Sequence, residues 1–205
     1  MIAPKPENSV FLNCPFDPSY KRIFEAIVFA IFDAGFIPRC ALEADDSTEN
    51  RLAKIFKLIS ECNYGIHDIS YTETDSATKL PRFNMPFELG LYFSCQRFGG
   101  RLHARKKSVI LDREPYRYRD SLSDIAGQDI HAHHSDPRAA VKEVRDWLRA
   151  KSGIRSIPGG AEIWQRYERF RIELPQMCEK ERILVEELTF ADFSNFVALW
   201  LEQSR

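Results

Sequence analysis

The first 135 residues alternate short β-rich runs with stretches of helical periodicity, and this alternation limits the folds open to the chain. Strands are predicted at 9–14, 36–43, 64–70, 106–112 and 128–134, and helices between them at 21–35, 49–63 and 84–97. Strands that alternate with helices at this spacing form parallel sheets covered on both faces. We therefore predict an α/β fold with a doubly wound parallel sheet of about five strands. Pro38 lies in the second run and places it at an edge or ends it early.

Beyond the fifth run the chain changes character. Three further helices are predicted, at 136–150, 161–181 and 190–203, and the tryptophans expected among their buried anchors are Trp147, Trp164 and Trp200. The only linker-like segment is 151–160. We therefore predict a flavodoxin-like core domain at residues 1–152 and a C-terminal helical extension at residues 153–205, packed on the core or on a partner subunit.

The composition narrows the classes of function. A chain of 205 residues, 44% hydrophobic and 29% charged, suits one α/β domain with an appendage. Its formal net charge of -1 argues against an electrostatic grip on nucleic acid or anionic lipid. No apolar run reaches the roughly 20 residues of a membrane span, and Met1–Asn8 has no signal-like apolar core, so we expect a cytoplasmic protein.

Several common chemistries lack their sequence signals. The five cysteines are scattered singly without a CxxC pair, so we expect reduced, mostly buried thiols. Cys14 ends a strand where a nucleophile could lie, but a structural thiol is the better interpretation. The "HAHH" histidines, His131, His133 and His134, match no zinc spacing and are interpreted as a surface loop, so no metal is assigned. Phosphate-binding glycine motifs and a GxSxG nucleophile motif are absent.

Polar residues gather where the predicted strands end. They are Asn13, Asp17, Arg39, Glu43, Asp68, Asp112 and Arg113. Ligands of doubly wound sheets bind beyond the carboxyl ends of the strands, so these side chains are candidates for a site. Each also has an ordinary structural interpretation: Asp68 and Asp17 could form turns, and Arg39 could be a surface arginine. His67 precedes Asp68 on its strand and is expected to face the opposite side.

Glu88 joins this group because a loop leads from the third strand into its helix. Asn84 is the expected N-cap of that helix, and Pro86 is tolerated in its first turn. The helix dipole alone could account for an early carboxylate. The surrounding apolar and aromatic residues favour a ligand instead, since burial raises the pKa of a carboxylate or requires a partner for it. An apolar wall with one carboxylate suits a ribose and its base.

Three segments together resemble a known superfamily. "VFLNCPFD", "RLAKIFKLISECNYGIHDIS" and "FNMPFELGLYF" are similar to the superfamily that joins nucleoside 2-deoxyribosyltransferases with TIR-like domains, including predicted nucleotide-binding TIR-like proteins of bacteria. The best local match is "NMPFELGL". The resemblance covers residues 9 to about 112. Tyr92 stands where the family often has a small residue, the polar loop up to Phe83 is long, and the C-terminal helices have no counterpart in the family.

The resemblance implies roles for particular residues. Glu88 would attack or stabilise the anomeric carbon of a ribose, and Asp68 would orient the sugar or donate a proton. The candidate substrate-binding residues are Phe11, Asn13, Asp17, Arg39, Asn84 and Tyr92. No cofactor is expected beyond a nucleotide that serves as substrate.

The sequence leaves three functions open. The first is an N-glycosidase or N-ribosyl transferase acting on a nucleotide, with NAD as the first substrate to test; the resemblance alone suggests an anti-phage effector. The second is a non-catalytic module of the same fold that senses a nucleotide or assembles through TIR-like contacts. The third is a structural subunit whose C-terminal helices recruit a partner protein. We expect a homo-oligomer and no direct binding of nucleic acid or membrane.

Overall fold

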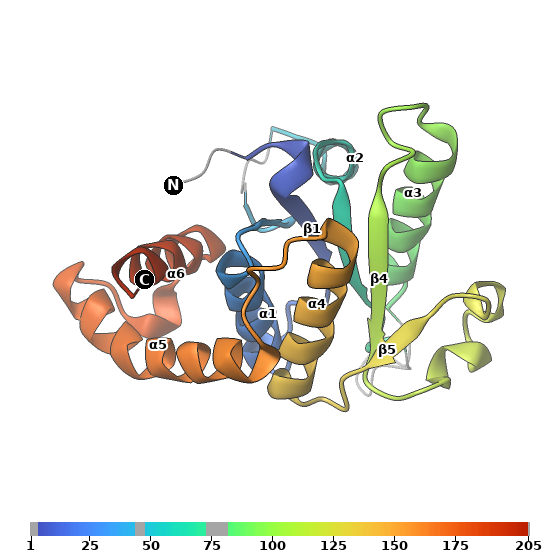
Figure 1. The fold of residues 1–205 in the computed structure, drawn as a ribbon. Coiled ribbons are helices and arrows are strands. Elements are labelled where there is room, and N and C mark those ends of the chain that lie inside the picture. The colour runs from blue at the N-terminus through green and yellow to red at the C-terminus, as the bar shows by residue number, and fades with distance from the viewer. Residues whose placement is uncertain (1–3, 44–47, 73–81, 205) are drawn as a thin grey trace.

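A five-stranded, all-parallel sheet forms the centre of the molecule (Figure 1). The computed structural model describes residues 4–43, 48–72 and 82–204. The strands lie in the order β2-β1-β3-β4-β5, with bounds β1 (Ser9–Asn13), β2 (Ile37–Arg39), β3 (Tyr64–Asp68), β4 (Lys107–Asp112) and β5 (Ile130–Ala132). The prediction of a flavodoxin-like doubly wound sheet is confirmed. All five predicted strands are present, and each is shorter than its β-rich run.

Helices cover both faces of this sheet. Their bounds are α1 (Lys21–Asp33), α2 (Arg51–Glu61), α3 (Asn84–Phe98), α4 (Pro137–Ser152), α5 (Gly160–Lys180) and α6 (Phe190–Gln203), with short 3-10 turns η1 (Pro6–Asn8), η2 (Arg117–Asp120), η3 (Ser123–Ile125) and η4 (Val185–Glu187). Helices α2 and α3 cover one face, while α1 and α4 cover the other. Figure 1 shows α5 and α6 as a further layer outside α1.

The residues of β1 explain why helices must cover both faces of the sheet. Val10 and Leu12 belong to the core beneath α1 and α4, whereas Phe11 packs under α2 and α3. Successive side chains of a strand point to opposite faces, so a strand without a polar face must be buried on both. Strand β2 has a different place, because it is a short edge strand that contains Pro38. This agrees with the expectation drawn from that proline.

The C-terminal helices share the core of the α/β sheet. The ring of Phe29 on α1 lies 5.5 Å from those of Tyr167 and Phe170 and 5.8 Å from that of Trp200. Trp200 is 3% exposed. Of the two packing arrangements that the sequence left open, the structure shows the one in which the extension packs on its own chain.

Two local predictions need correction. Phe83, rather than Asn84, holds the N-cap position of α3, and no side chain caps that helix. The helical periodicity of residues 49–63 predicts one apolar face, formed by Leu52, Ile55, Phe56 and Ile59. In the structure Leu52 and Phe56 are 38% and 49% exposed. Only Ile55 and Ile59 of that face, together with Leu58, are buried against the sheet.

Residues 73–81 of the predicted polar loop lie outside the described residues. No helix in the described part of the chain is long and apolar enough to cross a membrane.

Candidate functional site

The carboxyl ends of β1 and β3 meet at the point where the strand order reverses. After β1 the chain forms β2 on one side of that strand, and it then crosses back to form β3 on the other side. Loops leave such a switch point in opposite directions and open a crevice where α/β proteins bind ligands. Asn13 and Asp68 are the last residues of these two strands.

Asn13 connects the end of β1 with the start of α3. Its side-chain amide donates a hydrogen bond over 2.8 Å to the backbone carbonyl of Met85 and lies 3.1 Å from Nδ1 of His67. The amide is buried, with 3% of the residue exposed. Burial lowers the pKa of His67 to about 3, so its ring is neutral, and a neutral Nδ1 can accept from the amide. Asn13 therefore fixes the first turn of α3 against the sheet.

Glu88 lies on the sheet-facing side of α3. It shares that side with Met85, Leu89 and Tyr92, at the spacing of three and four residues that defines one helix face. As the fifth residue of the helix, it lies beyond the first turn, where the helix dipole has most of its effect. The helix dipole therefore does not account for the presence of Glu88 at this position.

The side chain of Glu88 is mostly buried. The residue is 7% exposed, and it forms no hydrogen bond or ion pair with any residue in the described ranges. Burial raises its pKa to about 7, and the charge of Arg51 partly opposes this rise. Burial raises the pKa values of Cys14 and Cys40, at the ends of β1 and β2, and the charge of Glu88 adds a smaller rise to both. A mostly buried carboxylate at a switch point, with no partner among the described residues, is the arrangement that a ligand completes.

Asp68 has a different environment. Its Oδ2 accepts from the hydroxyl of Tyr20 over 2.5 Å and lies 2.9 Å from Nε2 of His133, while its Oδ1 accepts from the backbone amide of Ser70 over 2.8 Å. The side chain has no exposed surface. The acid role expected for Asp68 would require one of these bonds to be released first.

His133 is the functional neighbour that the sequence analysis missed. It was interpreted as part of a surface loop, but it is 1% exposed and follows β5 directly into the core. Its Nδ1 accepts from the backbone amide of Ser135 over 3.1 Å, so Nε2 carries a proton, and Nε2 lies 2.9 Å from Oδ2 of Asp68 and 3.0 Å from Oγ of Ser70. A catalytic Ser-His-Asp triad uses both ring nitrogens, one toward each partner, so this buried cluster is not one.

Phe11 and Tyr92 form core rather than pocket. Both have no exposed surface, and their rings stack at 6.5 Å with an angle of 8°. The hydroxyl of Tyr92 donates to the backbone carbonyl of Lys107 over 3.1 Å. As these two side chains lie in the structure, they present no surface that a substrate could touch.

The remaining candidates lie apart from one another. Asp17 pairs with Arg82 over 2.5 Å, which links the loop after β1 with the residues before α3. Arg39 is held by Glu43 at 2.7 Å and Glu61 at 3.4 Å, on the side of the β2 edge. Asn84 is exposed at the start of α3. Asp17 thus lies near the start of α3, and Arg39 is engaged in ion pairs with Glu43 and Glu61.

Asp112, at the end of β4, is also paired with an arginine. Its Oδ1 accepts from Nε and Nη2 of Arg117 at 3.0 and 2.6 Å, and Arg117 also donates to the carbonyl of Ile69 over 2.9 Å. Burial raises the pKa of Asp112, and Arg117 counteracts the rise. Arg117 therefore ties the loop after β4 to the end of β3.

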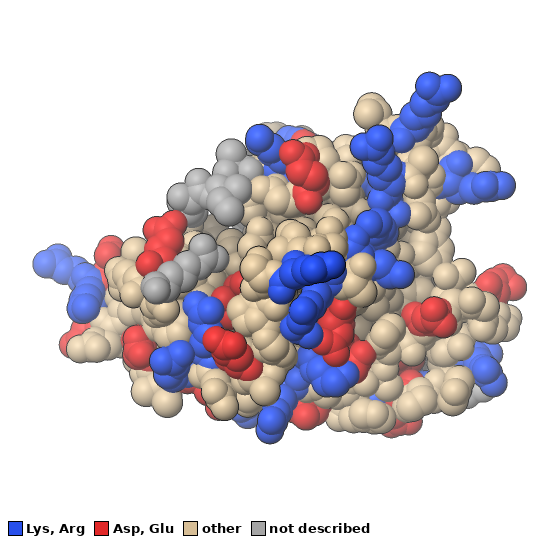
Figure 2. Space-filling model, in the orientation of Figure 1, with Lys and Arg blue, Asp and Glu red and all other residues tan. Residues whose placement is uncertain are grey.

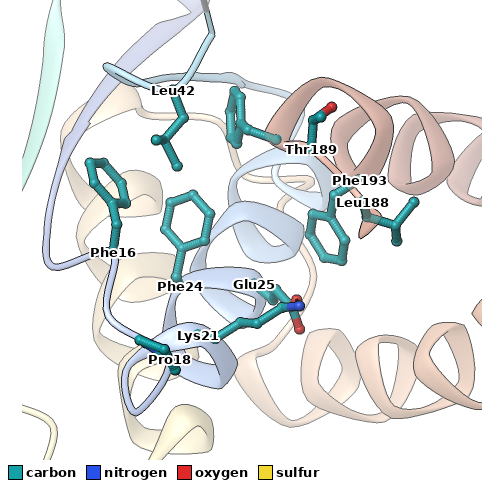
Figure 3. A pocket seen from close by; sticks show the side chains of 10 residues that line it. Phe16, Pro18, Lys21, Phe24, Glu25, Leu42, Leu188, Thr189 and Phe193 are labelled. Atoms are coloured by element: carbon teal, nitrogen blue, oxygen red, sulfur yellow. The ribbon is translucent and has the colours of Figure 1, made fainter. Parts of the chain in front are cut away.

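A cavity of about 400 Å³ opens at the same end of the sheet (Figure 3). Its lining includes Phe16 and Leu42, from the loops after β1 and β2, together with Phe24 of α1 and Phe193 of α6. The rings of Phe16 and Phe24 pack edge to face, with their centroids 5.5 Å apart. Lys21 and Glu25, 3.7 Å apart, line its rim. A second cavity, of about 540 Å³, lies between the β2 edge and α6.

The described residues contain no cluster of His, Cys, Asp or Glu placed to hold a metal ion. No family model, no curated protein and no solved structure matches this chain significantly. The interpretation of the site therefore depends on its own geometry.

Proposed function

We propose that this chain breaks or transfers the bond between a ribose and its base in a nucleotide, with Glu88 as the carboxylate that faces the anomeric carbon. The observation that carries the proposal is the burial of Glu88 at the switch point without a partner among the described residues. The family resemblance around "NMPFELGL" supports the same role for this residue.

The chemistry needs a negative charge beneath the sugar. Cleavage of an N-glycosidic bond develops an oxocarbenium-like positive charge, which an adjacent carboxylate can stabilise or trap covalently. With a pKa of about 7, Glu88 is only partly ionised at neutral pH. A cationic sugar would favour its ionised form. The low polarity that raises the pKa also strengthens this attraction.

The state of Asp68 limits the leaving group. Both its oxygens accept hydrogen bonds from the protein, so Asp68 offers no ready proton to a leaving group. A cationic base such as the nicotinamide of NAD departs as a neutral molecule and needs no donor. NAD is therefore the first substrate to test.

The aromatic cavity of Figure 3 offers a place for the other part of such a substrate. Apolar cavities of roughly 300 to 1,000 Å³ with a few polar groups are typical small-molecule sites. Phe16 and Phe24 would contact an aromatic ring, and Lys21 would lie near a phosphate. A dinucleotide would then extend from this cavity to Glu88.

One observation favours a second function. Four of the predicted site residues (Phe11, Asp68, Tyr92 and Arg39) are already packed or paired within the protein. A module that binds a nucleotide without turning it over needs fewer free catalytic groups. Under this alternative, Glu88 would hydrogen-bond a ribose hydroxyl.

The test compares wild type, Glu88→Gln and the surface control Glu162→Gln. Each full-length protein is incubated with NAD, then with a panel of nucleosides and nucleotides, and the products are separated by chromatography. Base release by wild type and the control, but not by Glu88→Gln, supports the enzyme. Equal release by all three would remove Glu88 from the mechanism. Absence of turnover together with nucleotide binding that Glu88→Gln weakens, measured by calorimetry, would favour the binding module.

A further inference from the structure

The loop between α3 and β4 presents apolar and basic side chains together. Phe98 and Leu102 are 82% and 83% exposed, which makes them the two most exposed large apolar residues of the described chain. Arg97, Arg101 and Arg105 alternate with them and are exposed. None of these three arginines forms an ion pair with a described residue. We call these five residues the α3–β4 tip.

The exposure of this tip is not a result of a loose loop. The amides of His103 and Ala104 both donate to the carbonyl of Gly100 over 3.1 Å, and Gly100 has the positive φ of 80° that suits glycine. Gly99 lies so close to His103 that an added Cβ would stand 2.7 Å from its ring. The turn is therefore compact and defined, although its two large apolar side chains point outward.

A buried lysine fixes the base of the loop. Lys106 is 1% exposed, and its ammonium group donates to the carbonyls of Ile59 and Cys62 at the end of α2. Gln96 donates to the carbonyl of Lys106 over 2.5 Å. The ammonium also lies 5.2 Å from the centre of the Tyr92 ring. These contacts hold the tip as a rigid projection.

The charge around the tip has one sign. Residues 89–111 contain no Asp or Glu. Figure 2 shows Lys and Arg side chains gathered over the α3–β4 loop and the start of β4, with no Asp or Glu among them on this face. Lys107, at the start of β4, is also exposed. The net charge of -1 for the whole chain conceals this local excess.

From this tip we infer a docking site for an anionic phospholipid bilayer. Apolar side chains that project from a basic surface insert at the boundary between headgroups and acyl chains, while the arginines attract the anionic headgroups. The loop projects from the body of the molecule in Figure 1, and a projection suits a flat bilayer better than a polynucleotide, which is usually held in a groove. Leu102 also has no π-face on which a base could stack.

The position of the tip is compatible with activity during docking. Helix α3 begins beside the carboxyl ends of the strands and ends at their amino ends, because β4 starts directly after the loop. Glu88 and the α3–β4 tip therefore lie at opposite ends of the sheet. Docking would leave the candidate site facing away from the membrane. The inference is independent of the proposed reaction.

Sedimentation with vesicles tests the inference. The full-length protein is mixed with large vesicles of phosphatidylcholine alone or of phosphatidylcholine with about 30% phosphatidylserine. The two loop variants are Phe98→Ser/Leu102→Ser and Arg101→Glu/Arg105→Glu. Ile172→Ser, at a residue 79% exposed on α5, is the apolar control, and Arg138→Glu/Lys180→Glu is the charge control. Circular dichroism establishes that every variant is folded.

We expect wild type to bind the anionic vesicles about tenfold more tightly than the neutral ones, with binding that falls as salt rises. Each loop variant should lose about tenfold in affinity for anionic vesicles, while both controls should match wild type. Equal partition into the two vesicle types, no binding to either, or full binding by both loop variants would overturn the inference. Tighter binding to a 30-base-pair DNA duplex or an RNA than to vesicles, lost with the arginines but kept without Phe98 and Leu102, would identify a nucleic acid as the partner instead.

Discussion

The side-chain amide of Asn13 donates a hydrogen bond over 2.8 Å to the backbone carbonyl of Met85, three residues before Glu88. This contact joins the end of β1 to the first turn of α3, although 72 residues separate the two partners. Asn13 therefore holds the turn of α3 that carries Glu88, and its predicted contact with a substrate stays a prediction.

Asn13→Leu should therefore lower the stability of the folded protein and shift the turn of α3 that carries Glu88. The change leaves the Met85 carbonyl and Nδ1 of His67 without their buried donor, which costs about 1 to 3 kcal/mol in the free energy of unfolding. Urea denaturation measures this loss, and the exposed Gln165→Leu serves as a control that should change it by less than about 0.5 kcal/mol. If base release is detected in wild type, its rate should fall in Asn13→Leu while the control retains it.

The pKa of Glu88 predicts how activity depends on pH. If the ionised carboxylate is the active form, kcat/KM for base release should rise as pH increases and level off above an apparent pKa of about 7. A pH profile between 5 and 9 measures this. A profile that stays flat across that range would contradict the role of an ionised Glu88.

The same pKa predicts an effect on stability. The folded-state pKa lies above the ordinary value of 4.5, so between about pH 4.5 and 7 the folded protein binds more protons than the unfolded chain. Stability from this group is therefore lost as pH rises through that range. Glu88→Gln should gain stability relative to wild type between pH 5 and pH 8, by about 1 to 3 kcal/mol. Urea denaturation at the two pH values tests this, and Glu162→Gln should show no such difference.

The buried bond between Tyr20 and Asp68 should matter more than a similar exposed one. Tyr20→Phe removes a donor to a carboxylate without exposed surface and should cost about 1.5 to 3 kcal/mol in stability. Tyr71→Phe removes the exposed contact between the Tyr71 hydroxyl and Ser19 Oγ, 2.7 Å apart, and should cost less than about 1 kcal/mol. Equal losses in chemical denaturation would mean that Asp68 does not depend on Tyr20.

The packing of α6 on α1 predicts that the C-terminal extension is part of one cooperative unit. Trp200→Ala removes a ring that packs on Phe29 and Phe170, and it should cost about 3 to 5 kcal/mol. Leu199→Ala, at a neighbouring residue 45% exposed, is the control and should cost under about 1 kcal/mol.

Removal of residues 153–205 should expose the apolar side of α1 and leave an unstable fragment. A soluble, folded fragment 1–152 would contradict this packing.

Local pattern in the sequence determined the fold class and the place of Glu88. Alternating strands and helices predicted the parallel sheet, Pro38 predicted a short edge strand, and the apolar setting of Glu88 predicted a buried carboxylate near the strand ends. These inferences hold because periodicity and chain direction are properties of neighbouring residues, which a sequence displays directly.

Tertiary structure alone decided which polar residues stay available. Asp68 meets Tyr20 and His133 across 48 and 65 residues of chain, and Phe11 stacks on Tyr92 across the interface between β1 and α3. Such pairings depend on which side chains converge when distant segments pack, and no local period records them. Burial of a polar group without water selects whichever distant partner can satisfy it. For this reason the sequence could predict the strand-end residues as candidates, whereas only the packed structure showed that Glu88 has no partner among the described residues while Asp68 and Arg39 do.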